Sequence, residues 1–495
     1  MGMMMTKGTM NQKVAWGLVV LFLLRILWHC FEPIGVVGDE AYYWDWSRRL
    51  DWGYFSKPPG IAWIHALAGF LGGQSVLGMK LMATALAVGG IWFLYRAVLL
   101  IAGEKIAVAA ALAAALLPGN LLLGSFLTTD SQLVFFWNLG FWMSCRIVLE
   151  KRVPGYVFWT LGFAIGMGSL FKQMMLVQIP LMWIGILWLR RDVIRRWEFP
   201  VATVGSLVFL IPTLLWNISN DWITAEHTAH HFEGRETGFM PFLKRLGDFY
   251  GVLALLLSPV LLGLMLYAGW MLTLRLRAAD IERRWLWLWS VLPFLVMTLM
   301  TLRQTVNANW PAVYFSGMIA LVAVHFGGRG GWWKSALGTA AFFTLLIMVV
   351  PFYLDSLYAG GKVIPQRRGW TGYPEMAAEV DAVRRNGENV IVVGHRFTAS
   401  QLAFHMRGQP RVWHWNAGDK IRSQYDLWPG PGGREACLLV VETVPGATLQ
   451  DEITDAAGGL EFLKAVPLHK HRPDTEFHLY RADGLNRWPR PVASK

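Results

Sequence analysis

Charged residues are scarce in this sequence. Lys, Arg, Asp and Glu make up only 16% of its 495 residues, against roughly a quarter in soluble proteins, whereas hydrophobic residues make up 55%. The mean hydropathy is positive. This composition excludes an ordinary soluble enzyme and predicts an integral membrane protein. The 27 Trp residues agree, because Trp anchors helix ends at membrane interfaces.

Cysteine is also rare, and the motifs of nucleotide-binding folds are missing. The three cysteines, Cys30, Cys145 and Cys437, form no C-x-x-C pair, which excludes a disulfide framework and a thiolate zinc site. The sequence contains neither G-x-G-x-x-G nor a P-loop, so no nucleotide-binding domain is indicated.

Long apolar runs dominate the first part of the chain. About 20 apolar residues span the hydrocarbon layer, and eleven runs approach or exceed that length. They cover residues 14–30, 76–102, 106–124, 133–149, 156–171, 174–189, 200–216, 250–274, 285–302, 310–326 and 336–354. A further run, 61–71, is too short to span and predicts an interfacial helix. We therefore expect a mainly α, polytopic helical bundle with about 11 transmembrane helices.

The loops between these runs alternate in charge. One set holds Lys7, Lys13, Lys105, Lys151, Arg152, Arg190, Arg191, Arg195, Arg196, Arg275, Arg277, Arg283, Arg284, Arg329 and Lys334. Cytoplasmic loops collect Lys and Arg, which predicts a cytoplasmic N-terminus and a first periplasmic loop at 31–75. The net charge of +12 arises largely in these loops and does not imply a nucleic-acid partner.

Two details concern the ends of the predicted spans. The first run is followed by Phe31-Glu32-Pro33 rather than a small-residue cleavage site, so it is predicted to be an uncleaved signal anchor. Arg25, Arg96 and Arg146 lie near the ends of their runs, and we expect their side chains to snorkel to the interface.

The composition changes beyond residue 354. Residues 389–394, 437–442 and 477–480 are short apolar segments typical of strands, and 399–406 favours a helix. The sequence therefore predicts two domains, a membrane domain at 1–354 and a small periplasmic α/β domain at 355–495.

Residues 38–60 carry the densest group of acidic and aromatic side chains. Helical spacing over 39–50 places Asp39, Tyr43 and Trp46 on one face. Asp39 and Glu40 lie in the first turn, where the helix dipole favours negative charge. An amphipathic interface helix with capping acids is the alternative interpretation.

The segment Lys57-Pro58-Pro59 predicts an anion site. Pro58 keeps Lys57 extended, and Pro59 suits the first turn of the next helix. An ammonium would then stand beside the open amides of Gly60 and Ile61, and in a membrane-surface loop the expected anion is a lipid phosphate. The alternative is a lysine that snorkels to lipid headgroups.

These motifs resemble a known family. The run Gly-Asp-Glu-x-Tyr-Tyr-x-x-Trp, followed by Gly-Tyr-Phe-x-Lys-Pro-Pro, is similar to bacterial members of the dolichyl-phosphate-mannose protein mannosyltransferase superfamily. That group includes the aminoarabinose transferases of lipid A and the rhizobial galacturonosyltransferases of lipopolysaccharide core. Further matching segments are Thr128-Thr129-Asp130, Phe171-Lys172, Asn220-Asp221-Trp222-Ile223 and Asn309-Trp310-Pro311.

The resemblance implies a GT-C fold with its active site on the outer face and a polyprenyl-phosphate sugar as donor. It implies that Asp39 is the catalytic carboxylate, Lys57 the phosphate-binding lysine and Asp130 a second acidic position. Our further site candidates are Glu40 as a catalytic acid, Lys172 and Arg303 as phosphate contacts, and Tyr42, Tyr43, Tyr54, Asn307, Asn309 and Trp310 as sugar or acceptor contacts.

The chemistry of glycosyl transfer independently suits Asp39 and Lys57. A base that takes the acceptor's proton contributes roughly 10²–10⁴-fold in rate, and a cation stabilises the departing phosphate. We expect Asp39 to act as the base, Lys57 to bind the carrier phosphate, and a single displacement to invert the anomeric centre.

The predicted function is transfer of a sugar from a polyprenyl-phosphate carrier to a lipid-linked glycan, such as lipid A or core oligosaccharide, at the periplasmic face of the bacterial inner membrane. The expected partners are the sugar donor, the glycolipid acceptor and membrane lipids. A protein O-glycosyltransferase is the alternative within the enzyme class. A transporter or flippase of a lipid-linked sugar is less favoured, because no internal repeat is visible and the acids cluster in loops.

No metal or other cofactor is required by this prediction. His227, His230 and His231 have a spacing that permits a divalent metal ion, since ligands three or four residues apart share a helix face. We treat them as weak candidates, and acceptor contact or a plain polar loop is the alternative.

Overall fold

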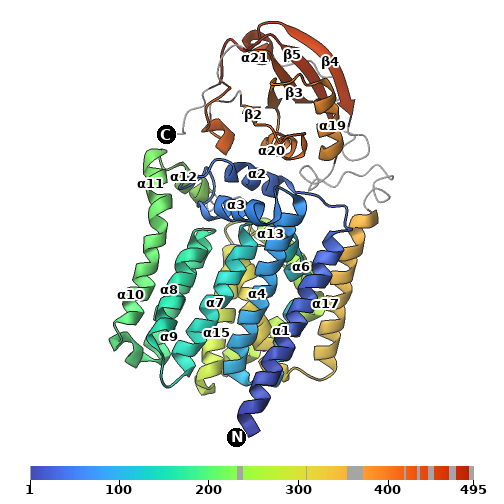
Figure 1. Cartoon of the computed structure of the whole chain (residues 1–495). Coiled ribbons are helices and arrows are strands. Elements are labelled where there is room, and N and C mark those ends of the chain that lie inside the picture. Colours follow the sequence, from blue (N-terminus) through green and yellow to red (C-terminus); the bar gives the residue numbers. More distant parts are fainter. Residues whose placement is uncertain are drawn as a thin grey trace.

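The structure is a computed structural model with two stacked parts, a helical bundle and a smaller sheet domain above it (Figure 1). A thin layer of short helices lies between them. The structure describes residues 2–230, 238–307, 309–353, 372–416, 418, 420–431, 435–443, 451–467 and 475–489. The mainly α class with a small C-terminal α/β unit is confirmed.

The bundle is built from the apolar runs, because a helix satisfies its own backbone groups where no water is available. Its longer helices are α1 (Gly2–His29), α4 (Val76–Ala102), α7 (Thr129–Leu149), α8 (Gly155–Ser169), α13 (Phe239–Leu257), α14 (Pro259–Leu274), α15 (Ile281–Met300) and α17 (Gly331–Val349). Its shorter helices are α5 (Glu104–Ala115), α6 (Pro118–Ser125), α9 (Gln178–Leu189), α10 (Glu198–Gly205), α11 (Ile211–Ser219) and α16 (Phe315–Phe326).

The number of spans is lower by a strict test of length and hydropathy. Within the described part of the chain, five helices are long and apolar enough to cross a membrane, or seven if two bent pairs each count as one span. The bent pairs are α5–α6, at 62°, and α13–α14, at 110°. The eleven transmembrane helices expected from the sequence therefore stay a prediction.

The bend between α5 and α6 is held by Arg25 of α1. Its guanidinium donates to the side-chain oxygen of Asn120 at 2.9 Å and to the carbonyl of Ala115 at 3.1 Å. A helix break leaves carbonyls without intrahelical partners, and the arginine supplies donors for them. The expectation that Arg25 snorkels to the interface is therefore wrong, because the side chain is buried.

The middle layer consists of α2 (Gly38–Ser47), α3 (Gly60–Gly72) and α12 (Ile223–His230). As expected, α3 is too short to cross the membrane. Helix α2 is buried over most of its length between the bundle and the sheet domain. This arrangement holds the acidic N-terminus of α2 at the junction of the two domains.

The upper domain has one mixed five-stranded sheet in the order β2-β1-β3-β5-β4. Strands β1 and β3 pair in parallel, as do β1 and β2, whereas β5 is antiparallel to β3 and β4. The strands are β1 (Asn389–Val393), β2 (Val412–Trp415), β3 (Cys437–Thr443), β4 (Leu460–Pro467) and β5 (Glu476–Ala482), and the helices are α19 (Tyr373–Val383), α20 (Arg396–His405) and α21 (Asp451–Ala456). The strands predicted at 389–394, 437–442 and 477–480 correspond to β1, β3 and β5.

The sheet domain shares a hydrophobic core with the middle layer. Helix α20 packs directly on α2, and residues of both belong to one buried cluster. Gly38 allows this approach, because a Cβ atom there would lie 2.5 Å from the ring of Phe397. The side chain of Gln401 donates to the carbonyl of Val36 at 2.7 Å. The predicted domain boundary at 354–355 lies outside the described residues, but the contact shows that the two domains pack closely.

Figure 1 places the N-terminus and the sheet domain at opposite ends of the bundle. The orientation of the chain in a membrane, with a cytoplasmic N-terminus, stays a prediction.

Candidate active site

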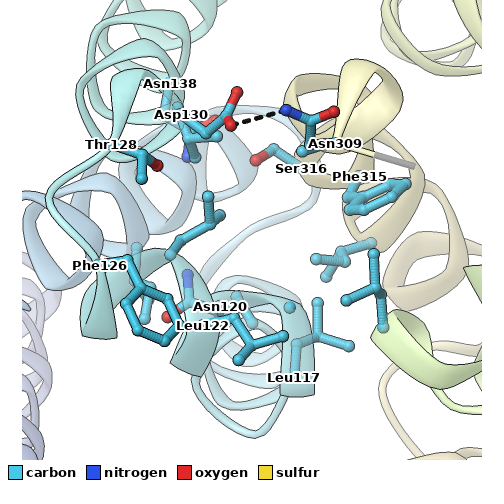
Figure 2. Close-up of a pocket in the computed structure, with 18 of the residues that line it drawn as sticks. Leu117, Asn120, Leu122, Phe126, Thr128, Asp130, Asn138, Asn309, Phe315 and Ser316 are labelled. Atoms are coloured by element: carbon cyan, nitrogen blue, oxygen red, sulfur yellow. Dashed lines mark hydrogen bonds between the residues drawn. The ribbon is translucent and has the colours of Figure 1, made fainter. Parts of the chain in front are cut away.

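Asp130 lies in the first turn of α7, and both of its carboxylate oxygens are occupied. Lys172 Nζ donates to Oδ1 at 2.7 Å. Asn309 Nδ2 donates to Oδ2 at 2.9 Å, as Figure 2 shows. Lys172 follows α8, and Asn309 precedes α16. The structure thus joins three of the predicted site residues, which come from separate segments of the chain. These bonds fix the carboxylate in place.

Asp39, in the first turn of α2, is the other carboxylate of the site. Its side chain is exposed to a cavity that Asp130 also lines, and it makes no hydrogen bond or ion pair with any residue that the structure describes. Burial within the surrounding protein raises its pKa, and the charge of Asp130 adds to this, whereas Arg396 and Lys57 oppose it. Asp39 is therefore a free carboxylate with increased proton affinity.

Lys57 lies in the loop before α3 and is partly buried. Burial and the nearby Lys172 ammonium lower its pKa, and attraction to Asp39 and Asp130 opposes the shift. Its ammonium forms no hydrogen bond or ion pair within the described ranges, whereas that of Lys172 is paired with Asp130. Lys57 does not line the cavity but lies near enough to Asp39 to interact with its charge.

The position of Lys57 depends on a close contact between α3 and the end of α8. The Gly60 amide donates to the carbonyl of Leu170 at 2.9 Å, and a Cβ atom at Gly60 would lie 2.7 Å from that oxygen. This contact brings Lys57 toward Lys172. It also corrects one prediction, because the Gly60 amide is already bonded and is not open to an anion.

The cavity between the two carboxylates has a volume of about 310 Å³. Its polar groups include Asp39, Thr128, Asp130 and Asn309. Figure 2 shows Asp130 and Asn309 on one side and a mostly apolar wall, with Leu117, Leu122 and Phe126, on the other. That wall comes from α4, the α5–α6 bend and α16, with Leu94, Leu117, Leu122, Leu123, Phe126, Phe315 and Ile319 among its side chains. The cavity can thus accept a molecule with a polar end and an apolar end.

Comparisons with known proteins agree with this architecture. The family model for dolichyl-phosphate-mannose-protein mannosyltransferase matches residues 56–216. The lipid A galacturonosyltransferase RgtD of Rhizobium johnstonii (strain DSM 114642 / LMG 32736 / 3841) is 27% identical over 395 residues, which cover 78% of this chain and 80% of the relative.

Two solved structures have a similar fold. ArnT from Cupriavidus metallidurans, in the apo state and bound to undecaprenyl phosphate, matches with a TM-score of 0.63 and 14% sequence identity. The match covers 94% of this chain and 98% and 97% of those chains. The chain therefore has the fold of these structures, and its sequence is similar to that of a lipid A glycosyltransferase.

Glu40 is buried and does not line the cavity. Its Oε1 accepts the amide of Leu127 at 2.7 Å, and its Oε2 accepts the amide of Val37 at 3.2 Å. The pKa of Glu40 is raised by burial, and Lys80 and the two amides oppose the shift. Glu40 connects α2 to the segment before Asp130, which favours positioning over the predicted catalytic role.

The predicted sugar-binding tyrosines pack inside the protein. Tyr54 stacks on Trp46 with 4.5 Å between ring centroids. The Tyr42 hydroxyl accepts the Gln424 amide of the sheet domain at 2.6 Å. Tyr42, Tyr43 and Tyr54 are all buried, and none lines the cavity. Their burial favours a packing role, and sugar contact stays a prediction.

Only part of the segment after α15 reaches the candidate site. Asn309 bonds Asp130, whereas Arg303 and Asn307 are exposed and do not line the cavity. Trp310 is partly buried and packs against the bundle core. A phosphate contact by Arg303 and acceptor contacts by Asn307 and Trp310 therefore stay predictions.

The weak metal candidates are only partly described. The His227 ring lies 4.9 Å from that of Phe55, the side chain of His230 is not described, and His231 lies outside the described residues. Within the described ranges, no group of three His, Cys, Asp or Glu side chains is arranged to hold a metal ion. The prediction that no metal is required has not been tested.

Sequence analysis missed Arg396, at the start of α20. This residue belongs to the sheet domain, yet its charge acts on Asp39 and Lys57. The membrane motifs gave no signal for it, because only the packing of α20 on α2 brings it to the site.

Proposed function

We propose that this protein transfers a sugar from a polyprenyl-phosphate carrier to lipid A or a related glycolipid at the outer face of the inner membrane. One observation carries the proposal. Of the two carboxylates at the cavity, Asp130 bonds both Lys172 and Asn309, while Asp39 has no hydrogen-bond or ion-pair partner in the described part of the chain.

Asp39 acts as the general base. A base must reach the acceptor's proton, and the cavity exposes the Asp39 oxygens. Its raised pKa increases the driving force for proton transfer from the acceptor hydroxyl. The hydroxyl then attacks the anomeric carbon, the bond to the carrier phosphate breaks, and the configuration inverts in this single displacement.

Lys57 stabilises the phosphate that leaves. Negative charge grows on that group in the transition state, and an ammonium already in place stabilises it without reorganisation. The apolar wall of the cavity suits the first isoprene units of the carrier, because both are apolar. Donor binding thus places the sugar–phosphate bond at the polar end, near Asp39.

The relatives support the choice of substrates. RgtD is named for transfer of galacturonic acid to lipid A, and ArnT has been crystallised with undecaprenyl phosphate. We therefore assign the carrier to the polyprenyl phosphates and the acceptor to lipid-linked glycans. In this proposal the N-terminus is cytoplasmic, and the active site and the sheet domain are periplasmic.

A polypeptide acceptor is the rival within the same chemistry, because the matching family model is named for protein mannosyltransferases. RgtD matches a much larger part of the chain, which favours the glycolipid.

The test compares cells that express the wild-type protein or Asp39→Asn at equal levels. Mass spectra of their lipid A, core oligosaccharide and glycoproteins are recorded. We expect one sugar residue to be absent from a glycolipid in the variant. If the glycolipid spectra are identical and a protein lacks a sugar in the variant, the acceptor is a polypeptide rather than a glycolipid. Identical spectra in every fraction would overturn the proposal.

A further inference from the structure

Arg396 is placed at the active site by two helix N-termini that meet. It is the first residue of α20, and this end of α20 packs on the start of α2, where Asp39 lies. The close approach of Phe397 to Gly38 fixes the contact. The sheet domain therefore brings a cation near Asp39, although Arg396 does not itself line the cavity.

The guanidinium of Arg396 is held by aromatic rings. Its Cζ lies 5.7 Å from the ring centroid of Tyr42 and 4.9 Å from that of Phe397. Such cation–π contacts orient the group but use none of its hydrogen-bond donors. The Nε atom is buried and has no hydrogen-bond partner in the part of the chain that the structure describes.

An unused buried donor is costly, since its desolvation is not offset by a hydrogen bond. Asp39 is near enough to interact with the charge of Arg396, but the two form no ion pair within 4 Å. Arg396 thus stands beside the base without pairing with it, and its terminal nitrogens form no hydrogen bond with the residues that the structure describes.

We propose that Arg396 binds an anionic oxygen group of the substrate next to the reacting carbon and so determines substrate specificity. This inference rests on the proposed function. Two sources share the required chemistry, a carboxylate on the transferred sugar and a phosphate on the glycolipid acceptor. Guanidinium recognises either group through charge-assisted, often bidentate hydrogen bonds.

The carrier's own phosphate is not the ligand in this proposal. The carrier phosphate is assigned to Lys57, whose ammonium lies near that of Lys172. Arg396 belongs to the sheet domain, and in this proposal it binds the sugar or the acceptor headgroup while Lys57 binds the carrier.

The test uses the purified full-length protein in four substrate combinations. The donors are undecaprenyl-phosphate galacturonate and undecaprenyl-phosphate galactose, which differ in the carboxylate. The acceptors are lipid A with and without its phosphates. Transfer is measured as kcat/KM, and binding of each substrate is measured by competition, so that a substrate that is not turned over still reports its affinity.

We expect Arg396→Gln to lower kcat/KM or affinity about 10–100-fold for one charged substrate and to leave its uncharged counterpart nearly unchanged. A loss that depends on the donor assigns Arg396 to the sugar carboxylate, and a loss that depends on the acceptor assigns it to the lipid A phosphate. Arg396→Lys keeps the charge and should recover part of the loss. Arg407→Gln is the matched control, because Arg407 is exposed just beyond α20 and should behave as wild type.

Equal losses in all four combinations would overturn the proposal and indicate a structural role or contact with the carrier phosphate. No loss in any combination would also overturn it. Failure of the proposed function is distinguishable, since the wild-type protein would then transfer no sugar from either donor. Thermal unfolding of each variant shows whether a uniform loss reflects misfolding.

Discussion

Lys172 and Asp130 form an ion pair in which Nζ lies 2.7 Å from Oδ1. The pair makes the two carboxylates of the site chemically unequal. Asp130 is held by two donors and keeps its position, whereas Asp39 has no such partner among the described residues and can accept a proton. Pairs of acids whose environments differ in this way mark a division of roles in active sites.

The first prediction concerns the base. We expect Asp39→Asn to lower kcat about 10²–10⁴-fold, because the amide cannot take the acceptor's proton. Burial disfavours the charged carboxylate, and Asn removes that charge without removing a recorded hydrogen bond. The melting temperature at neutral pH should therefore not fall. Transfer assays and thermal unfolding on the same preparation check both expectations.

The control for this variant is Asp248→Asn, which removes an exposed carboxylate on α13. Wild-type turnover is expected for it. If Asp39→Asn keeps more than a tenth of wild-type kcat, Asp39 is not the base.

The second prediction concerns the phosphate contact of Lys57. A hydrogen bond to a charged group contributes about 1.5–3 kcal/mol, so Lys57→Ala should weaken undecaprenyl-phosphate binding roughly 10–100-fold. Lys57→Arg keeps the charge and should lose less. Direct binding measurements in detergent or nanodiscs test this. Unchanged affinity in Lys57→Ala would assign the phosphate to another cation.

The third prediction tests whether Asp130 and Lys172 act as a unit. Removing one partner of a buried ion pair leaves an uncompensated charge, which costs about 3–5 kcal/mol in fully buried cases. The pair here is slightly exposed, at 15% and 12% of its side-chain surface, so a smaller loss is expected. Asp130→Asn and Lys172→Gln should each lower the melting temperature.

The double variant Asp130→Asn/Lys172→Gln should be less destabilised than the sum of the two single variants, because neither charge remains unpaired. Additive losses would show that the two residues act independently. Transfer by the double variant should still fall, since the site loses the fixed group that orients Asn309.

Sequence patterns predicted the parts of this protein that depend on local chemistry. The apolar runs gave the helical bundle, and the motifs around Asp39, Lys57 and Asp130 gave a group of residues that the fold brings together. Strands β1, β3 and β5 were likewise visible as short apolar segments. Each of these signals lies within a few neighbouring residues.

The missed features depend on contacts between distant segments. Arg25 was predicted to snorkel, but a helix break elsewhere in the chain supplied carbonyls for it. The Gly60 amide was expected to face an anion, but it donates a hydrogen bond to the carbonyl of Leu170 instead. Arg396 carries no local motif, and only domain packing gives it a place at the site. A single sequence does not contain this information in readable form.

The fourth prediction separates Glu40 from Asp39. Both oxygens of Glu40 accept backbone amides, so Glu40→Gln loses one of these bonds and should destabilise the protein by about 1–3 kcal/mol. Activity per folded molecule should fall much less than in Asp39→Asn. Transfer at a temperature below the unfolding transition distinguishes the two roles. A loss as large as that of Asp39→Asn, without a change in melting temperature, would make Glu40 catalytic.

The last prediction concerns pH. Asp39 must be ionised to act as a base, and its pKa lies above the usual value near 4. We therefore expect kcat/KM to rise with pH, with a midpoint above the ordinary aspartate range. Lys57 must be protonated to bind phosphate, and its pKa lies below the usual value. Activity should therefore decline at alkaline pH before an ordinary lysine would lose its proton, near 10.4.

Two variants test whether the acid and alkaline limbs of the pH–activity profile belong to Asp39 and Lys57. Lys57→Arg should move the alkaline limb upward, because a guanidinium stays protonated in proteins. Arg396→Gln should move the acid limb to higher pH, because Arg396 is the first of the cations that oppose the rise in the Asp39 pKa. A pH–rate profile of kcat/KM at fixed ionic strength measures both shifts. An acid limb that stays in place in Arg396→Gln would show that it reports a group other than Asp39, since loss of the nearby cation must change the proton affinity of this carboxylate.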